Sequence, residues 1–349
     1  NNLTISNLIG IEGAADSINY IKFTNCNVQD YSAMNMLINL EQLYLVKPAE
    51  KNEEIARLGS FDKGIASGEF SKLQYFGIVG NGTYINESNK DFYASERYGI
   101  TDISSLANFS DVTKKAIKYM NLQNLQLTSI ASLSGFTNVY YLRMEYNALT
   151  TLDGIQNMSG LKYLIAFRQY SNTTSSYTLG INESDVTSET DALRYIYKNN
   201  NVNSELYYVD LRYNNNLKYV DGLSGCTGIR YLYMDENTAI KNMGSIKTIL
   251  GNCGANYSIP GAYGLEIIAD NTKVLSLNGK TLTIEEFEQL KNRTTLTHLD
   301  LNNVIITDEL GTKLTTTTTP SFNEIVNNVL ATCTNLQYLQ LYGLSNLTT

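Results

Sequence analysis

The sequence predicts an α/β solenoid, a curved array of short repeats with a parallel β-sheet on its concave side and loops, 3-10 turns and short helices on its convex side. Two observations lead to this fold class. The pattern apolar-x-x-apolar-x-apolar recurs along the 349 residues, and many of its copies are evenly spaced. A fixed period of this kind is the signature of a repeat architecture. A single unit cannot bury its own apolar side chains, so neighbouring units must stack around a shared core.

Ten copies of the pattern each predict one short strand. Their first residues are Ile18, Leu40, Leu73, Ile117, Val139, Leu161, Leu206, Ile229, Leu296 and Leu336. The spacing is 22 residues from Ile18 to Leu40 and from Ile117 to Val139, and it is 23 residues from Leu206 to Ile229. We therefore expect one strand for each repeat of about 22 residues.

Four segments break the period and are predicted to be insertions. From Leu73 to Ile117 the spacing doubles to 44 residues, and residues 81–99 lack the apolar pattern, so we expect an insertion there rather than a hidden repeat. Similar irregular segments lie near 47–69, 170–203 and 250–282. Only three prolines occur, which makes a Pro-rich linker impossible. Residues 1–349 should therefore form a single domain of about ten repeats.

The C-terminal part of the chain adds helices to the repeats. The motifs Thr283-x-x-Glu286 and Ser321-x-x-Glu324 match the capping box, whose two side chains satisfy free N–H groups at the start of a helix. They predict helices over 284–292 and 322–333. An Asn-Gly pair between the two apolar runs of 273–282 predicts a β-hairpin.

One copy of the pattern continues into a longer motif. Val139-x-x-Leu142-x-Met144-x-x-Asn147-x-Leu149-x-x-Leu152 comprises a strand, an asparagine turn and a return limb, which together make a complete leucine-rich repeat. Residues 100–165 resemble the bacterial surface and secreted leucine-rich repeat proteins, the internalins in particular. The similarity recurs at the start of the chain and over 206–246. It implies recognition of a host protein and a location that is extracellular or on the bacterial cell surface.

Composition excludes several classes of function. The chain carries 34 acidic and 26 basic residues, and its net charge of −8 argues against a nucleic-acid partner. A single histidine removes most histidine-based catalysis and metal ligation, and the acidic residues show no catalytic dyad. We therefore predict that the protein is not an enzyme and has no cofactor and no metal site. No run of 18 apolar residues occurs, so we expect no transmembrane segment in this chain, and we expect a monomer.

The four cysteines are predicted to be mainly core residues. Cys226 and Cys333 occupy the repeat position that Phe136 and Met158 fill in other copies, and a free cysteine behaves there as a small apolar residue. The resemblance implies that Cys26 lies at the position where asparagine or cysteine is usual. Cys253 has no evident place, and a disulfide between it and Cys226 stays open as an alternative.

A column of tyrosines is the main candidate for function. The third position of the pattern faces the concave surface and holds, from the first repeat to the last, Tyr20, Gln42, Tyr75, Tyr119, Tyr141, Tyr163, Tyr208, Tyr231, His298 and Tyr338. Strands of one sheet lie ~4.8 Å apart, so these rings should stack and stiffen the sheet. Tyrosine is also enriched in binding hot spots, so the same column could be a recognition surface. The two interpretations are compatible.

Charged residues of both signs accompany the tyrosines in the middle repeats. The candidate partner-binding residues are Tyr119, Tyr141, Arg143, Tyr163, Arg168, Tyr208, Asp210, Arg212, Tyr231, Tyr233, Asp235, His298 and Tyr338. Mixed charge suits a protein partner or a glycan better than DNA, although such charges also serve to keep an exposed apolar stripe soluble. We expect an adhesin-like module that binds a protein partner. The alternatives are a carbohydrate-binding surface protein and a structural spacer of a larger surface protein.

Overall fold

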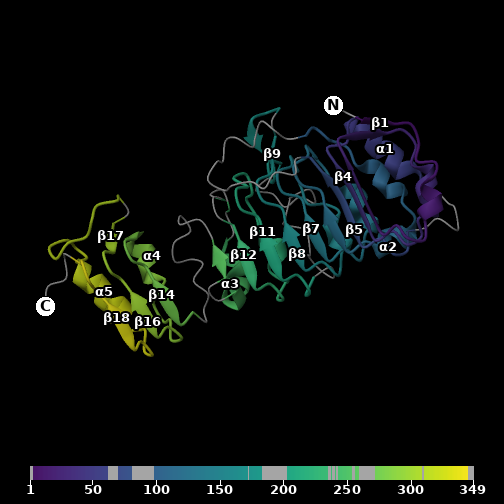
Figure 1. The fold of residues 1–349 in the computed structure, drawn as a ribbon. Coiled ribbons are helices and arrows are strands. Elements are labelled where there is room, and N and C mark those ends of the chain that lie inside the picture. Colours follow the sequence, from purple (N-terminus) through teal and green to yellow (C-terminus); the bar gives the residue numbers. More distant parts are fainter. Residues whose placement is uncertain are drawn as a thin grey trace. The chain divides into compact units, whose positions relative to one another are not determined.

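The computed structural model describes residues 3–61, 70–80, 98–171, 173–182, 203–234, 237, 240, 243–253, 256–258, 272–308 and 310–344 (Figure 1). The chain divides into two compact units. The first comprises Asn1–Asn242 and Asn256–Pro260, and the second comprises Met243–Ala255 and Gly261–Thr349. The single repeat domain that the sequence predicts over residues 1–349 stays a prediction.

A nine-stranded parallel sheet organises the first unit (Figure 1). Its strands follow chain order: β2 (Tyr20–Thr24), β4 (Gln42–Val46), β5 (Tyr75–Val79), β6 (Tyr119–Asn121), β7 (Tyr141–Arg143), β8 (Tyr163–Ile165), β11 (Tyr208–Asp210), β12 (Tyr231–Tyr233) and β13 (Tyr257–Ser258). The strands from β2 to β12 begin two residues after eight of the ten predicted starts. Those eight strand predictions are confirmed, and β5 pairs directly with β6.

Between the strands the chain returns through short helices. These are η1 (Ile11–Ala14), η2 (Ser32–Met36), α1 (Lys51–Phe61), η4 (Ser104–Asn108), α2 (Asp111–Ala116), η5 (Ala131–Gly135), η6 (Ile155–Asn157) and η8 (Asp221–Leu223). Consecutive return limbs pack on each other, as η4 does on η5 and η5 on η6. Two small sheets complete the unit: β1 (Leu3–Ile5) pairs in parallel with β3 (Cys26–Val28), and β9 (Tyr170–Ser171) pairs antiparallel with β10 (Ser176–Tyr177).

The core of the first unit consists of the apolar positions of the repeat. In the repeat that contains β7, Val139, Leu142 and Met144 are all fully buried. Full burial of one such side chain contributes ~1.5–3 kcal/mol, so the stacked repeats share a large apolar core.

All four cysteines are free. Cys226 and Cys333 are buried, which confirms their prediction as core thiols, and the alternative disulfide between Cys226 and Cys253 is wrong. Burial raises the pKa of the Cys226 thiol to about 11. Cys26 is half-buried in β3.

The second unit contains a three-stranded parallel sheet of β14 (Val274–Ser276), β16 (His298–Asp300) and β18 (Tyr338–Gln340), and a parallel pair of β15 (Thr281–Thr283) and β17 (Ile305–Thr307). Its helices are η9 (Met243–Ile246), α3 (Lys247–Cys253), α4 (Ile284–Glu288) and α5 (Phe322–Leu330). The capping box of α4 is confirmed, since Thr283 and Glu286 exchange side-chain and backbone hydrogen bonds. Ser321 caps α5 by accepting from the Glu324 N–H at 3.2 Å.

One prediction for residues 250–282 needs correction. The insertion predicted there stays a prediction, and the segment contains β13, which pairs with β12, and β14, which pairs with β16. The predicted hairpin within 273–282 is wrong. Gly279 does adopt a left-handed turn with φ +71°, but β14 and β15 on either side of it each pair in parallel with a strand of the following repeat. Stacking between repeats therefore determines the pairing.

Candidate functional site

The tyrosine column forms in register on the nine-stranded sheet. Backbone pairing aligns Tyr75, Tyr119, Tyr141, Tyr163, Tyr208 and Tyr231 on six adjacent strands. Each of these six side chains is half-buried. We call this side of the sheet the tyrosine face. The column extends through Gln42 to Tyr20 on β2, where the tyrosine side chain is exposed.

The rings along the column contact one another. Tyr75 and Tyr119 stack with centroids 4.5 Å apart. The following pairs are tilted, with centroid separations from 5.4 Å between Tyr141 and Tyr163 to 6.3 Å between Tyr119 and Tyr141. Aromatic pairs at 4.5–7 Å contribute ~0.5–1.5 kcal/mol beyond their buried area. The predicted packing of neighbouring rings along the column is confirmed from Tyr75 to Tyr231.

A second set of tyrosines widens the face. Tyr140 and Tyr207 precede β7 and β11, and their rings lie 5.5 Å and 6.1 Å from the ring of Tyr163. Tyr207 also lies 5.3 Å from Tyr231, and Tyr233 lies 5.5 Å from Tyr208. The aromatic surface therefore continues without a break from β5 to β12.

Four tyrosines of the tyrosine face have a raised pKa. A hydrogen bond with Tyr140 raises the pKa of Tyr163, and one with Tyr231 raises the pKa of Tyr207. Burial raises the pKa of Tyr141, and it raises the pKa of Tyr208 to about 12. At neutral pH these four side chains therefore present neutral hydroxyl groups.

The charged candidates on this face pair with each other. Arg143 forms an ion pair with Glu145, to which its Nε donates at 2.9 Å. Arg212 forms a two-point contact with Asp210, with Nε–Oδ1 at 3.0 Å and Nη2–Oδ2 at 2.8 Å. Glu145 and Asp210 are only 1% and 2% exposed, so each arginine covers a buried carboxylate. These four charges cancel locally.

Arg212 also packs on aromatic rings. Its guanidinium carbon lies 5.6 Å from the ring centroid of Phe167 and 5.8 Å from that of Tyr233. Tyr146 meets Phe167 edge-on at 5.0 Å. Phe167 was not among the candidates from the sequence. It lies two residues after Ile165, and the alternation of side chains along an extended chain was the signal that could have found it.

Four predicted site residues do not join this group. Arg168 is 8% exposed and its backbone is left-handed, so most of its side chain is covered. Asp235 lies outside the described residues. His298 and Tyr338 belong to the second unit, where their rings lie 5.5 Å apart on paired strands. The candidates on the tyrosine face are therefore Tyr119, Tyr141, Arg143, Tyr163, Tyr208, Asp210, Arg212, Tyr231 and Tyr233.

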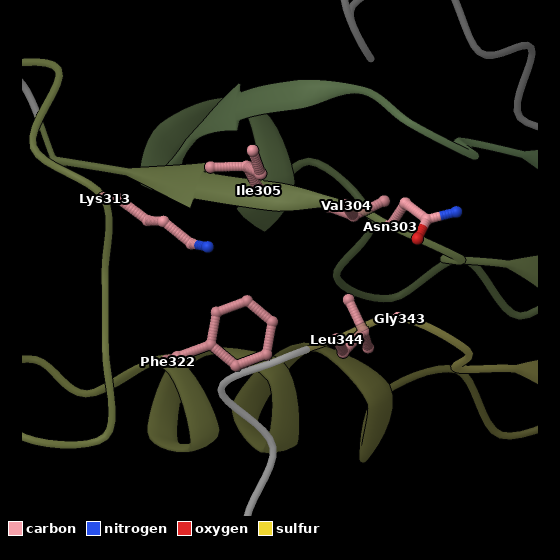
Figure 2. Close-up of a pocket in the computed structure, with 7 residues that line it drawn as sticks. All are labelled: Asn303, Val304, Ile305, Lys313, Phe322, Gly343 and Leu344. Atoms are coloured by element: carbon pink, nitrogen blue, oxygen red, sulfur yellow. The ribbon is translucent and has the colours of Figure 1, made fainter.

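The second unit contains a pocket of about 210 Å³ (Figure 2). Its lining is formed by Asn303, Val304, Ile305, Lys313, Phe322, Gly343 and Leu344. Figure 2 shows the Lys313 side chain extending toward the space between Ile305 and Phe322.

Within the described ranges, His, Cys, Asp and Glu form no cluster that could hold a metal ion. None of the described helices is long and apolar enough to cross a membrane.

A ladder of buried amides holds the strands of the tyrosine face in register. The Nδ2 of Asn147, which follows β7, donates to the carbonyls of Met144 in its own repeat and Leu122 in the preceding one, at 2.9 Å and 2.7 Å. Its Oδ1 accepts from the Leu127 N–H at 3.2 Å. Gln169, Asn214 and Asn237 make corresponding bonds in the following repeats. One strand per repeat, together with this amide turn, defines the architecture. The chain has a leucine-rich repeat fold.

Solved structures of leucine-rich repeat proteins are similar to this chain. An internalin (inlF) from Listeria monocytogenes is 14% identical over 99% of this chain and 76% of its own, with a TM-score of 0.38. Internalin C2 from the same species is 17% identical over 71% of this chain and 82% of its own, with a TM-score of 0.44. A leucine-rich repeat protein of Leptospira interrogans is 14% identical over 98% and 88%, with a TM-score of 0.39. No protein-family model and no curated protein sequence matches the chain.

Proposed function

We propose that the chain is a non-enzymatic, adhesin-like binding module, monomeric and either secreted by a bacterium or carried on its surface, that recognises a protein partner through the tyrosine face. The observation that carries the proposal is the unbroken array of tyrosine rings from Tyr75 to Tyr231. Tyrosine supplies a large, rigid contact area and a hydroxyl at low cost in conformational entropy, and it is enriched in binding hot spots. The bacterial location comes from the resemblance of the sequence to internalins.

A protein partner fits the tyrosine face better than a sugar does. A sugar would stack on an open ring face, whereas Tyr141, Tyr163 and Tyr208 are half-buried and each lies between two neighbouring rings. The pairing of Arg143 and Arg212 with buried carboxylates leaves a centre that is aromatic and nearly neutral. Aromatic residues and arginine, with few uncompensated charges, are typical of the core of a protein interface.

The test is a binding screen of the purified chain against arrayed extracellular proteins, with soluble oligosaccharides as competitors. Three variants are screened beside it. The triple variant Tyr141→Ala, Tyr163→Ala, Tyr208→Ala removes the centre of the face. The corresponding triple Phe variant keeps the rings and removes the hydroxyls. Tyr342→Ala is the matched control, because Tyr342 is an exposed tyrosine of the second unit.

We expect a protein hit that the Ala triple loses and Tyr342→Ala keeps, with circular dichroism confirming that every variant is folded. A hit that survives in the Phe triple assigns the binding to ring area, and one that is lost assigns it to the hydroxyls. Competition by an oligosaccharide would move the function to carbohydrate binding. A blank screen, or hits that ignore the Ala triple, would contradict the proposal and favour a spacer.

A further inference from the structure

A row of alternating cations and tyrosines runs beside the tyrosine column, at the position that precedes each strand. It consists of Lys118, Tyr140, Lys162, Tyr207 and Arg230 on five successive strands, and we call it the cation–tyrosine row. Each backbone N–H in the row donates to the carbonyl of the residue before it, at 2.7 Å for Tyr140 to Lys118 and 2.9 Å for each later step. The hydrogen bonds of the sheet therefore place these five residues side by side in this alternating order.

The side chains of this row are accessible. Lys118 and Arg230 are exposed, Tyr207 is 37% exposed, and Tyr140 and Lys162 are half-buried. The Lys162 ammonium lies 5.6 Å from the ring centroid of Tyr140. It also reaches Glu205 at 3.2 Å, but both side chains of that pair are open to solvent, and such surface pairs are weak.

The charge of the row differs from that of the neighbouring arginines. Arg143 and Arg212 are each bound to a buried carboxylate. The Nη1 of Arg230 instead donates to the backbone carbonyls of Thr227 and Ile229, which fix the guanidinium without neutralising it. In a chain with a net charge of −8, this row is a local stripe of positive charge, and its complement is an extended acidic ligand.

The spacing of the cations selects the conformation of that ligand. Neighbouring strands lie ~4.8 Å apart, so cations on alternate strands are ~9.6 Å apart. In an extended β-strand, side chains on one face repeat every ~6.7 Å, which does not match. In a polyproline II helix every third residue lies on the same face, and three residues rise by ~9.3 Å, which does match.

We propose that the cation–tyrosine row binds a polyproline II segment of the protein partner that carries an acidic residue at every third position. The acidic side chains meet Lys118, Lys162 and Arg230, and the proline rings between them pack against Tyr140 and Tyr207. Aromatic side chains are the usual receptors for polyproline II segments, which lose little entropy on binding. The inference rests on the proposed function in one respect, namely that the partner is a protein.

The test uses synthetic peptides and does not need the partner. One labelled peptide has five repeats of Glu-Pro-Pro, a second has five repeats of Glu-Pro-Pro-Pro, and a third has five repeats of Lys-Pro-Pro. The first two carry the same five glutamates, and the second has a longer period because each repeat contains one more proline. Binding to the full chain is measured by fluorescence anisotropy at low and at physiological salt. We expect the Glu-Pro-Pro peptide to bind, the longer period to bind roughly tenfold more weakly, and the lysine peptide not to bind.

Two triple variants with the same change in net charge complete the experiment. The first triple variant should bind the Glu-Pro-Pro peptide roughly tenfold more weakly. It combines Lys118→Gln, Lys162→Gln and Arg230→Gln. Lys22→Gln, Lys115→Gln, Lys280→Gln removes three exposed cations outside the row and should leave the affinity unchanged. The proposal would be overturned if the two triple variants lost the same affinity for the peptide, or if the two glutamate peptides bound equally well. It would also be overturned if the Glu-Pro-Pro peptide did not bind at all. Tighter binding of an anionic polysaccharide such as polygalacturonate would also overturn it, in favour of an acidic glycan.

This measurement and the partner screen can fail separately. A screen hit that depends on Tyr141, Tyr163 and Tyr208 but no binding of the Glu-Pro-Pro peptide would refute the row and leave the tyrosine face intact. Period-dependent peptide binding with a screen indifferent to those tyrosines would refute the tyrosine face and keep the row.

Discussion

Removing one amide from the ladder should destabilise the repeats on both sides of it. Asn147 is fully buried, and its side chain bonds the backbone of Leu122, Met144 and Leu127. Asn147→Ala deletes all three bonds and leaves two carbonyls and one N–H in the core without this partner. At ~1 kcal/mol net for each bond, the variant should lose about 3 kcal/mol of unfolding free energy.

The matched control is Asn138→Ala. Asn138 is also an asparagine that bonds to the preceding repeat, but its side chain is exposed and makes a single bond of 2.8 Å to the Lys115 carbonyl. Its removal should cost less than about 1 kcal/mol. The comparison isolates the effect of burying three bonds, because both variants delete the same chemical group.

Two measurements check this prediction. Urea unfolding followed by circular dichroism gives the overall loss of stability. A repeat array can unfold in segments, so hydrogen exchange of the Leu127 amide gives the local loss, which should appear as roughly a hundredfold faster exchange. The reasoning is refuted if Asn147→Ala destabilises the protein no more than Asn138→Ala does.

Three further predictions test other features. Gly77→Ala would place a Cβ 2.5 Å from Cδ1 of the Tyr44 ring, so the ring must move and the protein should lose about 1–3 kcal/mol, with a changed near-ultraviolet circular dichroism signal; an unchanged signal would count against this close contact. Thr283→Ala should cost about 1 kcal/mol and speed exchange at the start of α4, while Thr283→Ser should restore both. Burial raises the pKa of the Glu54 carboxyl group above 4.5, so the folded state binds the carboxyl proton more tightly than the unfolded state does. The stability gained from this proton is present below pH 4.5 and is lost as the pH rises through the raised pKa. Glu54→Gln should therefore flatten the fall in the urea midpoint above pH 4.5, and equal slopes in the two proteins would argue against this account.

Ten strands and the tyrosine column could be predicted because the repeat fixes which residues point inward. The pattern does not mark β13, nor β14, which the sequence assigns to a hairpin, because their copies of the pattern are incomplete. The first position of the pattern is Gly254 in the copy that contains β13 and Thr272 in the copy that contains β14. Neither copy therefore begins with an apolar residue. Their strands form because the neighbouring repeat supplies the hydrogen-bond partners, which no local pattern records.

The sequence names the charged residues of the candidate site, but the structure shows that four charged groups of the face form two internal ion pairs. Residues two apart on an extended chain lie on the same face, so Arg143 can reach Glu145 and Arg212 can reach Asp210. This spacing was available in the sequence and predicts internal pairing. The burial of Arg168 was not available, because it depends on how adjacent repeats pack around a left-handed residue.

The one-strand-per-repeat pairing has an evolutionary consequence. Each ring of the tyrosine column contacts its neighbours on adjacent strands, and the backbone bonds that align them are the same at every step. Duplication of a 22-residue segment such as 139–160, which would copy β7 and its return limb, would lengthen the face by one ring and ~4.8 Å without altering the contacts further along. Selection can therefore adjust the length of the tyrosine face in discrete steps of one repeat, through duplication of the corresponding gene segment.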